Sequence, residues 1–186
     1  ILCHPEIVWN IRELPPLPAN APALPDILED LPEASPFWWN NARRDYLISQ
    51  MSEKHAAQLK IMMKGNKWSY GTMFRRIRKG RSMAELRNDS VAGCLRTPRG
   101  GSARQILIRA GRGQVNVRFL TPRECARLMG ASDFVIKTNF NKALFGFGDA
   151  VCVPVVSWIA RNYLNPLVEE MLKNSHGVPE HVAFGN

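Results

Sequence analysis

Cysteine is scarce in this sequence, and the few cysteines stand far apart. Four occur in 186 residues, at Cys3, Cys94, Cys125 and Cys152, with no Cys-x-x-Cys pair and no histidine at ligand spacing. We therefore expect no metal site, because a zinc centre needs closely paired ligands. A disulfide framework is not expected at this size and spacing either, which predicts a reducing, cytoplasmic environment. Each cysteine is interpreted as a small buried hydrophobic residue.

Long apolar runs and targeting signals are also missing. The longest apolar stretch near the C-terminus, residues 150–160, is interrupted by Pro154 and Ser157 and is too short to cross a bilayer. Residues 1–6 have neither the basic start nor the cleavage site of a signal peptide, and the missing initial Met suggests that further sequence precedes them. The composition, 45% hydrophobic and 22% charged, is typical of a globular protein without a membrane span.

Acidic residues are scarce in one central block. Between Lys64 and Arg118, fourteen Lys or Arg stand against only Glu85 and Asp89, so this window carries +12, whereas the whole chain carries +9. A polyanion is the natural partner of such a block, because each neutralised phosphate releases condensed counterions. A solvated basic face without any partner is the alternative interpretation.

Prolines concentrate between residues 12 and 36, where seven of the thirteen occur. Because proline removes a hydrogen-bond donor and restrains the residue before it, this segment is predicted to be an extended connector that crosses a surface, with one helical turn at 26–31. Apolar residues then recur at three- and four-residue steps over 41–64, with Tyr46 and Met51 on the apolar stripe, which predicts a helix there.

The basic block alternates between short apolar stretches and glycine-rich breaks. Residues 91–97, 104–110 and 115–120 are predicted to be strands separated by these breaks, and in the last two the side chains alternate as in a half-buried strand. The last two strands are expected to form a half-buried hairpin around Gly111–Gly113. Residues 74–81 are interpreted either as a loop or as a strand edge.

The clearest local signal is the run Thr121–Gly130, with the sequence TPRECARLMG. Thr121 is a helix N-cap, Pro122 fits the first helical position and Glu124 completes a capping box, while the last glycine ends the helix. A long C-terminal helix is predicted from about residue 150 to 173. One proline falls near its start, where the missing donor costs least, and a second proline introduces a kink.

Three segments resemble conserved parts of the bacterial cytosine-5 DNA methyltransferases. Arg118–Gly130 and Phe145–Ala160 are similar to the last two conserved motifs of that family, and the first of these runs is highly specific. Asp89–Ile108 resembles the end of the family's target-recognition region, while 12–88 fit only as its variable part. The resemblance implies methyl transfer from S-adenosylmethionine to carbon 5 of a cytosine flipped out of a specific duplex site, in a bacterial or phage restriction-modification system.

The resemblance also implies roles for residues of the two motifs. In the family, a small lobe reads the DNA and the last helix packs on the larger, cofactor-binding lobe. The residues that would organise the recognition lobe are Arg118, Thr121, Pro122, Arg123, Glu124 and Arg127. The residues that would line the S-adenosylmethionine pocket from its far side are Phe147, Gly148, Asp149 and Ala150. Many family members have Asn in place of Asp149, so this side chain either contacts the cofactor or caps the final helix.

The residues that perform the family's chemistry are missing from the chain. No Pro-Cys nucleophile, no Glu-Asn-Val segment and no Phe-x-Gly-x-Gly cofactor loop occurs, so no catalytic residue is assigned. We interpret the chain as one subunit of a two-chain methyltransferase or as a C-terminal piece of a longer enzyme. Its partner would then be a catalytic lobe that carries those motifs and binds most of the cofactor. A stand-alone DNA- or RNA-binding module and a structural protein of a ribonucleoprotein particle are the alternatives.

The basic block suits duplex DNA as a second partner. Arginine forks onto a guanine edge or a phosphate, and paired glycines let the backbone come close to either. The residues predicted to bind DNA through one loop are Arg96, Thr97, Arg99, Gly100, Gly101, Ser102 and Arg104. Arg75, Arg76 and Arg78 are predicted to contact the phosphate backbone, which positions a protein without specifying a sequence.

The expected fold is α+β. It comprises a small DNA-recognition lobe with irregular loops, a β-hairpin sheet and short helices, and a long C-terminal helix that docks on a missing Rossmann-like catalytic lobe. The expected parts are a Pro-rich connector (1–36), a target-recognition domain (37–140), the C-terminal helix segment (141–174) and a flexible tail (175–186). No membrane partner is expected.

Overall fold

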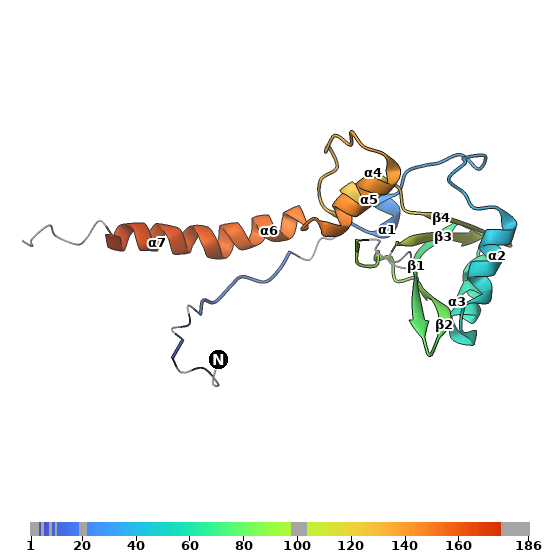
Figure 1. Ribbon diagram of the computed structural model, residues 1–186, viewed down its shortest axis with the longest axis horizontal. Coiled ribbons are helices and arrows are strands. Elements are labelled where there is room, and N and C mark those ends of the chain that lie inside the picture. The colour runs from blue at the N-terminus through green and yellow to red at the C-terminus, as the bar shows by residue number, and fades with distance from the viewer. Residues whose placement is uncertain are drawn as a thin grey trace, which may run out of the picture. The chain divides into compact units, whose positions relative to one another are not determined.

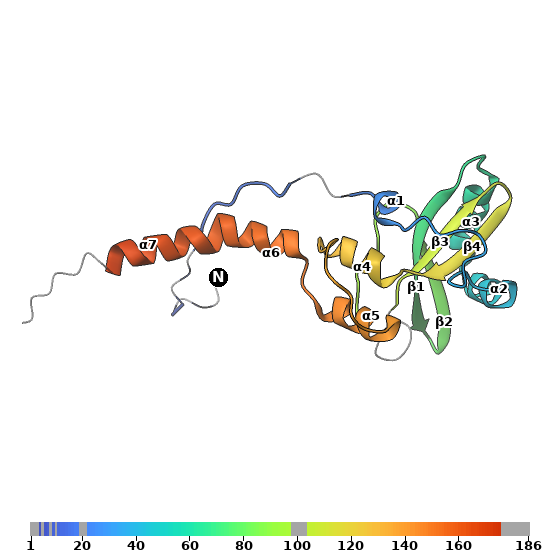
Figure 2. The same ribbon diagram turned by 90° about the horizontal axis from the view of Figure 1, so that it is seen from above.

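Figures 1 and 2 show the computed structural model, which describes residues 4, 6–7, 9, 11–18, 22–97 and 104–175. The chain divides into two units. Residues 21–152 form a sheet-containing unit, and residues 1–20 together with 153–186 form the other. Apart from Ser175, the tail predicted to be flexible lies outside the described residues.

A four-stranded antiparallel sheet forms the centre of the larger unit. Its strands are β1 (Ser69–Arg78), β2 (Arg81–Arg87), β3 (Ile106–Gly111) and β4 (Gln114–Phe119), in the order β2-β1-β3-β4. β1 pairs with both β2 and β3, so Met73 lies opposite Leu86 on one side and Ile106 on the other. The mixed helix-and-sheet class and the hairpin predicted over 104–120 are confirmed.

Both hairpins close with two-residue turns whose residues all have positive φ. The turns are Lys79 (50°) with Gly80 (74°), and Arg112 (55°) with Gly113 (76°). This backbone conformation matches the right-handed twist of the flanking strands, which is why it joins them so tightly. Residues 74–81, interpreted as a loop or a strand edge, therefore run along the end of β1 and through the turn into β2.

Residues 91–97 do not form the strand that the sequence predicts. Both sides of β1 are already paired, with β2 and with β3. The Gly93 amide instead donates to the hydroxyl of Thr72 at 3.2 Å. A side chain at Gly93 would collide with Gln105, whose Cδ would lie 2.7 Å from the added Cβ. The segment therefore packs against the sheet as an irregular stretch that leads into the predicted recognition loop.

Two helices, α2 (Asn41–Ser49) and α3 (Glu53–Lys64), cover one face of the sheet. The helical pattern predicted over 41–64 is confirmed, but a break at residues 50–52 divides it into two helices. The Ala84 amide donates to the Gln50 carbonyl at 3.0 Å, and Met51 forms a β-bridge with Ala84, so the backbone leaves the helix to pair with the sheet edge. Tyr46, placed on the apolar stripe by the sequence, is exposed. The core on this face includes Leu47, Leu59, Met62, Met73, Ala84, Ile108 and Val117.

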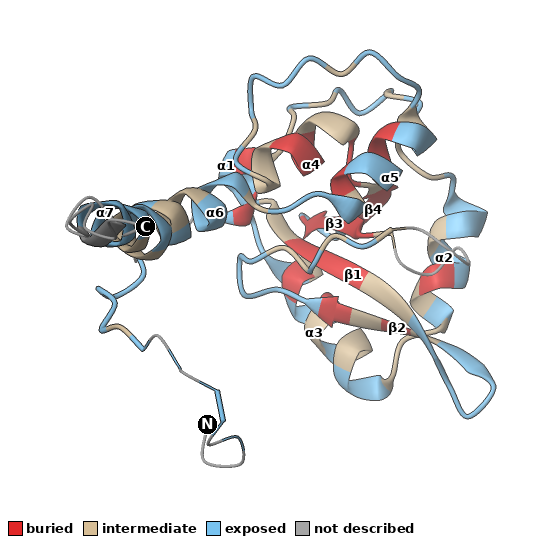
Figure 3. Ribbon diagram, turned by 60° about the vertical axis from the view of Figure 1, so that its left-hand side comes forward, coloured by how far each residue is buried: buried red, intermediate tan, exposed pale blue. Residues whose placement is uncertain are grey.

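Three helices cover the other face of the sheet, as Figure 3 shows: α1 (Leu24–Ile27), α4 (Pro122–Leu128) and α5 (Phe140–Asp149). Their buried side chains form a second core around Leu107 and Leu120. The connector is anchored in this core, because Leu24 and Ile27 are 1% and 3% exposed. Its helical turn lies at 24–27 and not at the predicted 26–31.

The smaller unit contains N-terminal residues and the C-terminal helix. The helix consists of α6 (Val153–Ile159), a π-helical turn (Ala160–Leu164) and α7 (Asn165–Ser175). The π turn ends two residues before Pro166, which has no amide hydrogen for a regular helical bond. Arg12 donates to the Glu170 carboxylate, which ties the N-terminal segment to α7. The helix begins at Val153 and not at the predicted residue 150.

The C-terminal helices are unusually apolar. The stretch Phe140–Lys173 contains an apolar window that is mostly exposed, so its length and composition alone would allow it to span a membrane. The backbone is extended at Ala150 (φ −73°, ψ 161°), which interrupts the stretch between α5 and α6. The sequence-based expectation of no membrane span considered only 150–160, and it stays a prediction.

Candidate nucleic-acid interface

An arginine-lined groove of about 570 Å³ lies beside the predicted recognition loop. Arg75 and Arg76 line it from β1, Arg87 from the end of β2 and Arg96 from the segment before the loop. Three of these four arginines are predicted from the sequence. Arg87 is not, because only its register opposite Thr72 brings it to this place. The other lining residues are Phe74, Ile77, Gly93, Cys94 and Gln105.

The two acids of the basic block neutralise only part of its charge. Glu85 accepts a hydrogen bond from Arg78 at 3.0 Å, and Asp89 accepts one from Arg87 at 2.7 Å. The bond from Arg87 holds the pKa of Asp89 below its usual range and raises the pKa of Arg87. Arg78, predicted to contact phosphate, is thus paired within its own hairpin. Arg96 has no ion-pair partner within 22–97 and 104–175, which leaves its charge available to a ligand.

A second arginine cluster consists of Arg43, Arg75 and Arg104. The Arg43 guanidinium of α2 lies 3.8 Å from the ring centre of Trp39 and 5.1 Å from that of Phe119, which Arg104 approaches at 5.3 Å. Burial, followed by the charges of Arg75 and Arg104, lowers the pKa of Arg43. Three like charges held this close favour an anion such as phosphate. The sequence does not reveal this cluster, because only the fold brings α2 to this end of the sheet.

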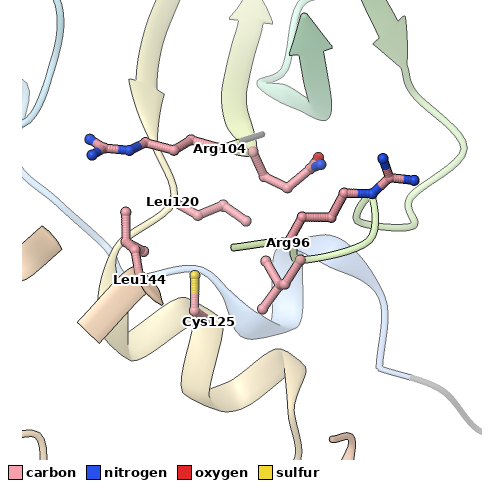
Figure 4. Close-up of a pocket in the computed structure, with 7 residues that line it drawn as sticks. Arg96, Arg104, Leu120, Cys125 and Leu144 are labelled. Atoms are coloured by element: carbon pink, nitrogen blue, oxygen red, sulfur yellow. The ribbon is translucent and has the colours of Figure 1, made fainter. Parts of the chain in front are cut away.

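The predicted recognition loop is described only at its two ends. Arg99, Gly100, Gly101 and Ser102 lie outside the described residues, whereas Arg96, Thr97 and Arg104 are described. In Figure 4, the side chains of Arg96 and Arg104 extend to opposite sides of a recess of about 20 Å³ that Leu120, Cys125 and Leu144 help to line. We call the two described ends of the loop, Arg96–Thr97 and Arg104, the loop stem. The two arginines present their charges on two sides of this stem.

The residues predicted to line a cofactor pocket lie at the end of α5, next to the loop stem. Phe147 is buried and packs edge-on against Phe134, with ring centres 6.1 Å apart. Asp149 accepts a hydrogen bond from the Thr97 hydroxyl. A Cβ at Gly148 would lie 2.5 Å from the backbone nitrogen of Thr97. The end of α5 therefore braces the loop stem, and its contact with a cofactor stays a prediction.

Replacing Gly148 by alanine should displace the loop stem and weaken DNA binding. The added methyl group would overlap backbone atoms of Arg96 and Thr97, which cannot turn aside as a side chain can. We expect the affinity for duplex DNA, measured by fluorescence anisotropy, to fall by about tenfold. Gly146→Ala, on the same helix with nothing within 4 Å of its Cβ, should change the affinity by no more than about twofold. Equal effects of the two substitutions would contradict the bracing role.

A buried ion pair joins β4 to α4. Arg118 and Glu124 are 1% and 0% exposed, and the two guanidinium Nη atoms donate to the two carboxylate oxygens at 2.7 and 2.5 Å. Glu124 also accepts from the backbone amides of Thr121 at 2.8 Å and Glu29 at 2.9 Å. The predicted capping box is present, since the Thr121 hydroxyl accepts from the Glu124 amide. One carboxylate thus holds β4, α4 and the connector together.

Two further arginines of α4 donate to backbone carbonyl groups. Arg127 binds the carbonyls of Ile27 and Leu28, each at 3.0 Å, and Arg123 binds those of Ser132 and Phe134. Pro122 stands at the start of the helix, as predicted. These contacts, together with the Arg118–Glu124 ion pair, hold β4, α4 and the connector together, while the role of the motif residues in organising a recognition lobe stays a prediction.

The described cysteines do not form a reactive centre. Cys125 is buried in α4, and burial, assisted by the Glu124 carboxylate, raises its pKa from 9.0 to about 12. Cys94 is exposed, which contradicts its interpretation as a buried residue, and Cys152 is half-buried, while Cys3 lies outside the described residues. No group of three or more His, Cys, Asp or Glu residues in the described part of the chain could hold a metal ion.

Cys125 should resist alkylation in the folded protein. The thiolate is the reactive form, and the raised pKa keeps its population small. The neutral thiol's contribution to stability is fully present below pH 9.0 and is lost as the pH rises towards about 12. In iodoacetamide labelling followed by peptide mass spectrometry, Cys94 should react well before Cys125, and the two should react alike in urea. Earlier labelling of Cys125 in the folded chain would contradict its burial.

Most of this chain matches one known protein family. A family model described as C-5 cytosine-specific DNA methylase matches residues 10–165, a span that includes the arginine groove, α4 and α5. Searches among curated proteins and among solved structures found no match.

Proposed function

We propose that this chain, which belongs to the C-5 cytosine-specific DNA methylase family, is the DNA-recognition part of a cytosine-5 DNA methyltransferase. It acts either as a separate subunit or as the C-terminal piece of a longer enzyme. The complete enzyme transfers a methyl group from S-adenosylmethionine to carbon 5 of cytosine in a specific duplex site. Its setting is a bacterial or phage restriction-modification system in the cytoplasm.

The arginine groove at the loop stem is the observation that carries this proposal. Four arginines line one recess of about 570 Å³, and an arginine guanidinium binds phosphate or a guanine edge through two parallel hydrogen bonds. Contacts to phosphate fix the register of the protein on the duplex, while contacts to base edges specify the sequence. We assign backbone contacts to the strand arginines and sequence preference to the loop that begins at Arg96.

The methyl-transfer chemistry is assigned to a separate catalytic lobe. The chain has no Pro-Cys or Glu-Asn-Val segment, and the raised pKa of Cys125 makes that thiol a poor nucleophile. This chain's contribution is to hold the duplex so that the target cytosine meets the catalytic groups. S-adenosylmethionine is bound mainly by the catalytic lobe, with residues 147–150 at the far side of its pocket.

The smaller unit exposes apolar side chains, which supports the assignment of a separate catalytic lobe as its partner. Large apolar side chains are exposed on its helix, and Ile11 and Leu17 of the N-terminal segment are 70% and 68% exposed. Exposed apolar surface of this extent marks an interaction site. We assign it to the catalytic lobe and not to a membrane, because the family match extends through residue 165. The helix residues concerned are Val155, Val156, Ile159, Leu164, Val168 and Leu172.

Reconstitution tests this function directly. The chain is mixed with a separately produced catalytic lobe that carries the Pro-Cys and Glu-Asn-Val segments, and transfer of a labelled methyl group to duplex DNA is measured. We expect no transfer by either part alone and transfer by the mixture. A chain that remains monodisperse, binds DNA and never associates with such a lobe would instead be a stand-alone binding module.

A further inference from the structure

A second recess lies under the connector and is separate from the arginine groove. It measures about 240 Å³. Leu28 and Leu31 of the connector form part of its wall, and Leu107 and Arg109 of β3 contribute to its floor. Among the described residues, none lines both this recess and the groove. The recess is therefore a separate site from the groove that is proposed to bind DNA.

Arg109 is the residue that points to a ligand. It is 8% exposed, and neither its Nε nor its Nη2 has a hydrogen-bond partner within the described parts of the chain. Its guanidinium carbon lies 4.6 Å from the ring centre of Trp38 and 4.5 Å from that of Trp68. The two rings pack against the guanidinium but accept no hydrogen bond from its Nε or Nη2. Because Nε and Nη2 share one edge of the guanidinium, they match the two oxygens of a carboxylate. Buried donors normally have partners, so this edge is an unfilled site.

The neighbouring charges narrow the choice of ligand. Arg118 lines the same recess with an unpartnered Nε, while its other nitrogens are engaged by Glu124. Glu29 and Asp30 also line the recess, and Glu124 balances the charge of Arg118, so Arg109 is the cation that attracts an anion here. Like-charge repulsion from the two acids disfavours a phosphate dianion more than a single carboxylate. The side chains of Leu28, Leu31 and Trp38, which line the recess, suit a ligand whose remaining part is apolar.

The nearest carboxylate of the chain itself does not fill this site. Glu33 Oε1 lies 3.9 Å from Arg109 Nη2, which is beyond hydrogen-bond distance, and the Glu33 side chain is 78% exposed. An exposed side chain at this distance gains little from the attraction, because solvent screens it. Glu33 is therefore a weak competitor at the mouth of the recess.

We propose that this recess binds a small organic monocarboxylate. Its two oxygens accept hydrogen bonds from Nε and Nη2 of Arg109, and its apolar body packs against Leu28, Leu31 and Trp38. The proposal rests on the buried arginine and the shape of the recess. It stands independently of the DNA-recognition function.

Benzoate serves as the probe, and benzamide is the neutral control of nearly the same shape. Each is titrated into the full ¹⁵N-labelled chain while the Nε–H signal of Arg109 is followed by NMR. We expect a saturable shift with benzoate, and binding weaker by about tenfold or more for benzamide and for inorganic phosphate. Glu33→Gln should tighten benzoate binding by roughly twofold, because it removes the competing charge.

Because Arg109 variants lack this signal, binding to them and to the unmodified chain is compared through the benzoate ¹H signals, and Arg109→Gln should weaken benzoate binding by about tenfold or more. Arg112→Gln is its matched control, since Arg112 lies 5.6 Å from the ring centre of Trp68 but does not line the recess, and it should change the affinity by no more than about twofold. If Arg109→Gln does not fold, Arg109→Lys keeps the charge, lacks the two-pronged edge and should lose benzoate as well. Equal binding of benzoate and benzamide, no saturable shift in the unmodified chain, or full binding by the Arg109 variants would overturn the proposal.

Discussion

Replacing Glu124 by alanine should lower the free energy of unfolding by about 3–5 kcal/mol. The substitution leaves the guanidinium of Arg118, 1% exposed, buried without its counter-charge. It also removes the acceptor for the backbone amides of Thr121 and Glu29, so α4 and the connector lose a shared anchor. Urea denaturation of the full chain, followed by circular dichroism, measures the change as a shift in the transition midpoint.

Two further variants distinguish the effect of leaving a buried charge unpaired from the effect of losing contacts in general. Replacing both Arg118 and Glu124 by leucine should destabilise less than Glu124→Ala, because no charge is then left buried. Glu170→Ala breaks only the exposed pair with Arg12 and should cost less than about 1 kcal/mol. If Glu124→Ala were no worse than Glu170→Ala, the buried pair would not be the anchor of this scaffold.

Features that the sequence predicts correctly have causes lying within a few residues. Thr121, Pro122 and Glu124 form a capping box because all three act within one helical turn. The β3–β4 hairpin follows from alternating apolar residues and from a two-residue turn, Arg112–Gly113, whose glycine adopts positive φ at low cost. Such signals do not depend on the rest of the fold.

Features that the sequence does not reveal depend on contacts between distant segments. The helix break after Ser49 exists because Gln50 accepts a hydrogen bond from Ala84 on β2. Residues 91–97 are predicted to be a strand, but the Gly93 amide donates to the Thr72 hydroxyl of β1 and not to a backbone carbonyl of a neighbouring strand. Arg87 enters the groove only through its register with Thr72. In each case the partner that decides the structure cannot be identified from the segment's own pattern.

Duplex DNA should bind this chain with an affinity that falls steeply as salt rises. Four arginines line the groove, and each phosphate contact releases about 0.9 counterion from the duplex. If the three strand arginines contact phosphate, raising the salt concentration about fourfold should lower the affinity by roughly fortyfold. Anisotropy titrations at several salt concentrations measure this slope, and an affinity independent of salt would contradict the phosphate contacts.

Single substitutions in the groove should separate affinity from sequence preference. Arg76→Gln removes a strand arginine, so it should weaken all duplexes equally and reduce the salt slope by about 1. Arg96→Gln acts at the loop stem and should cost about 1–3 kcal/mol on the target site but less on random DNA in the assembled enzyme. Lys54→Gln, an equal loss of charge on the exposed surface of α3, should change neither. Identical behaviour of the Arg76 and Arg96 variants on target and random DNA would show that the strand and the loop share one role, because only a base contact makes the loss depend on sequence.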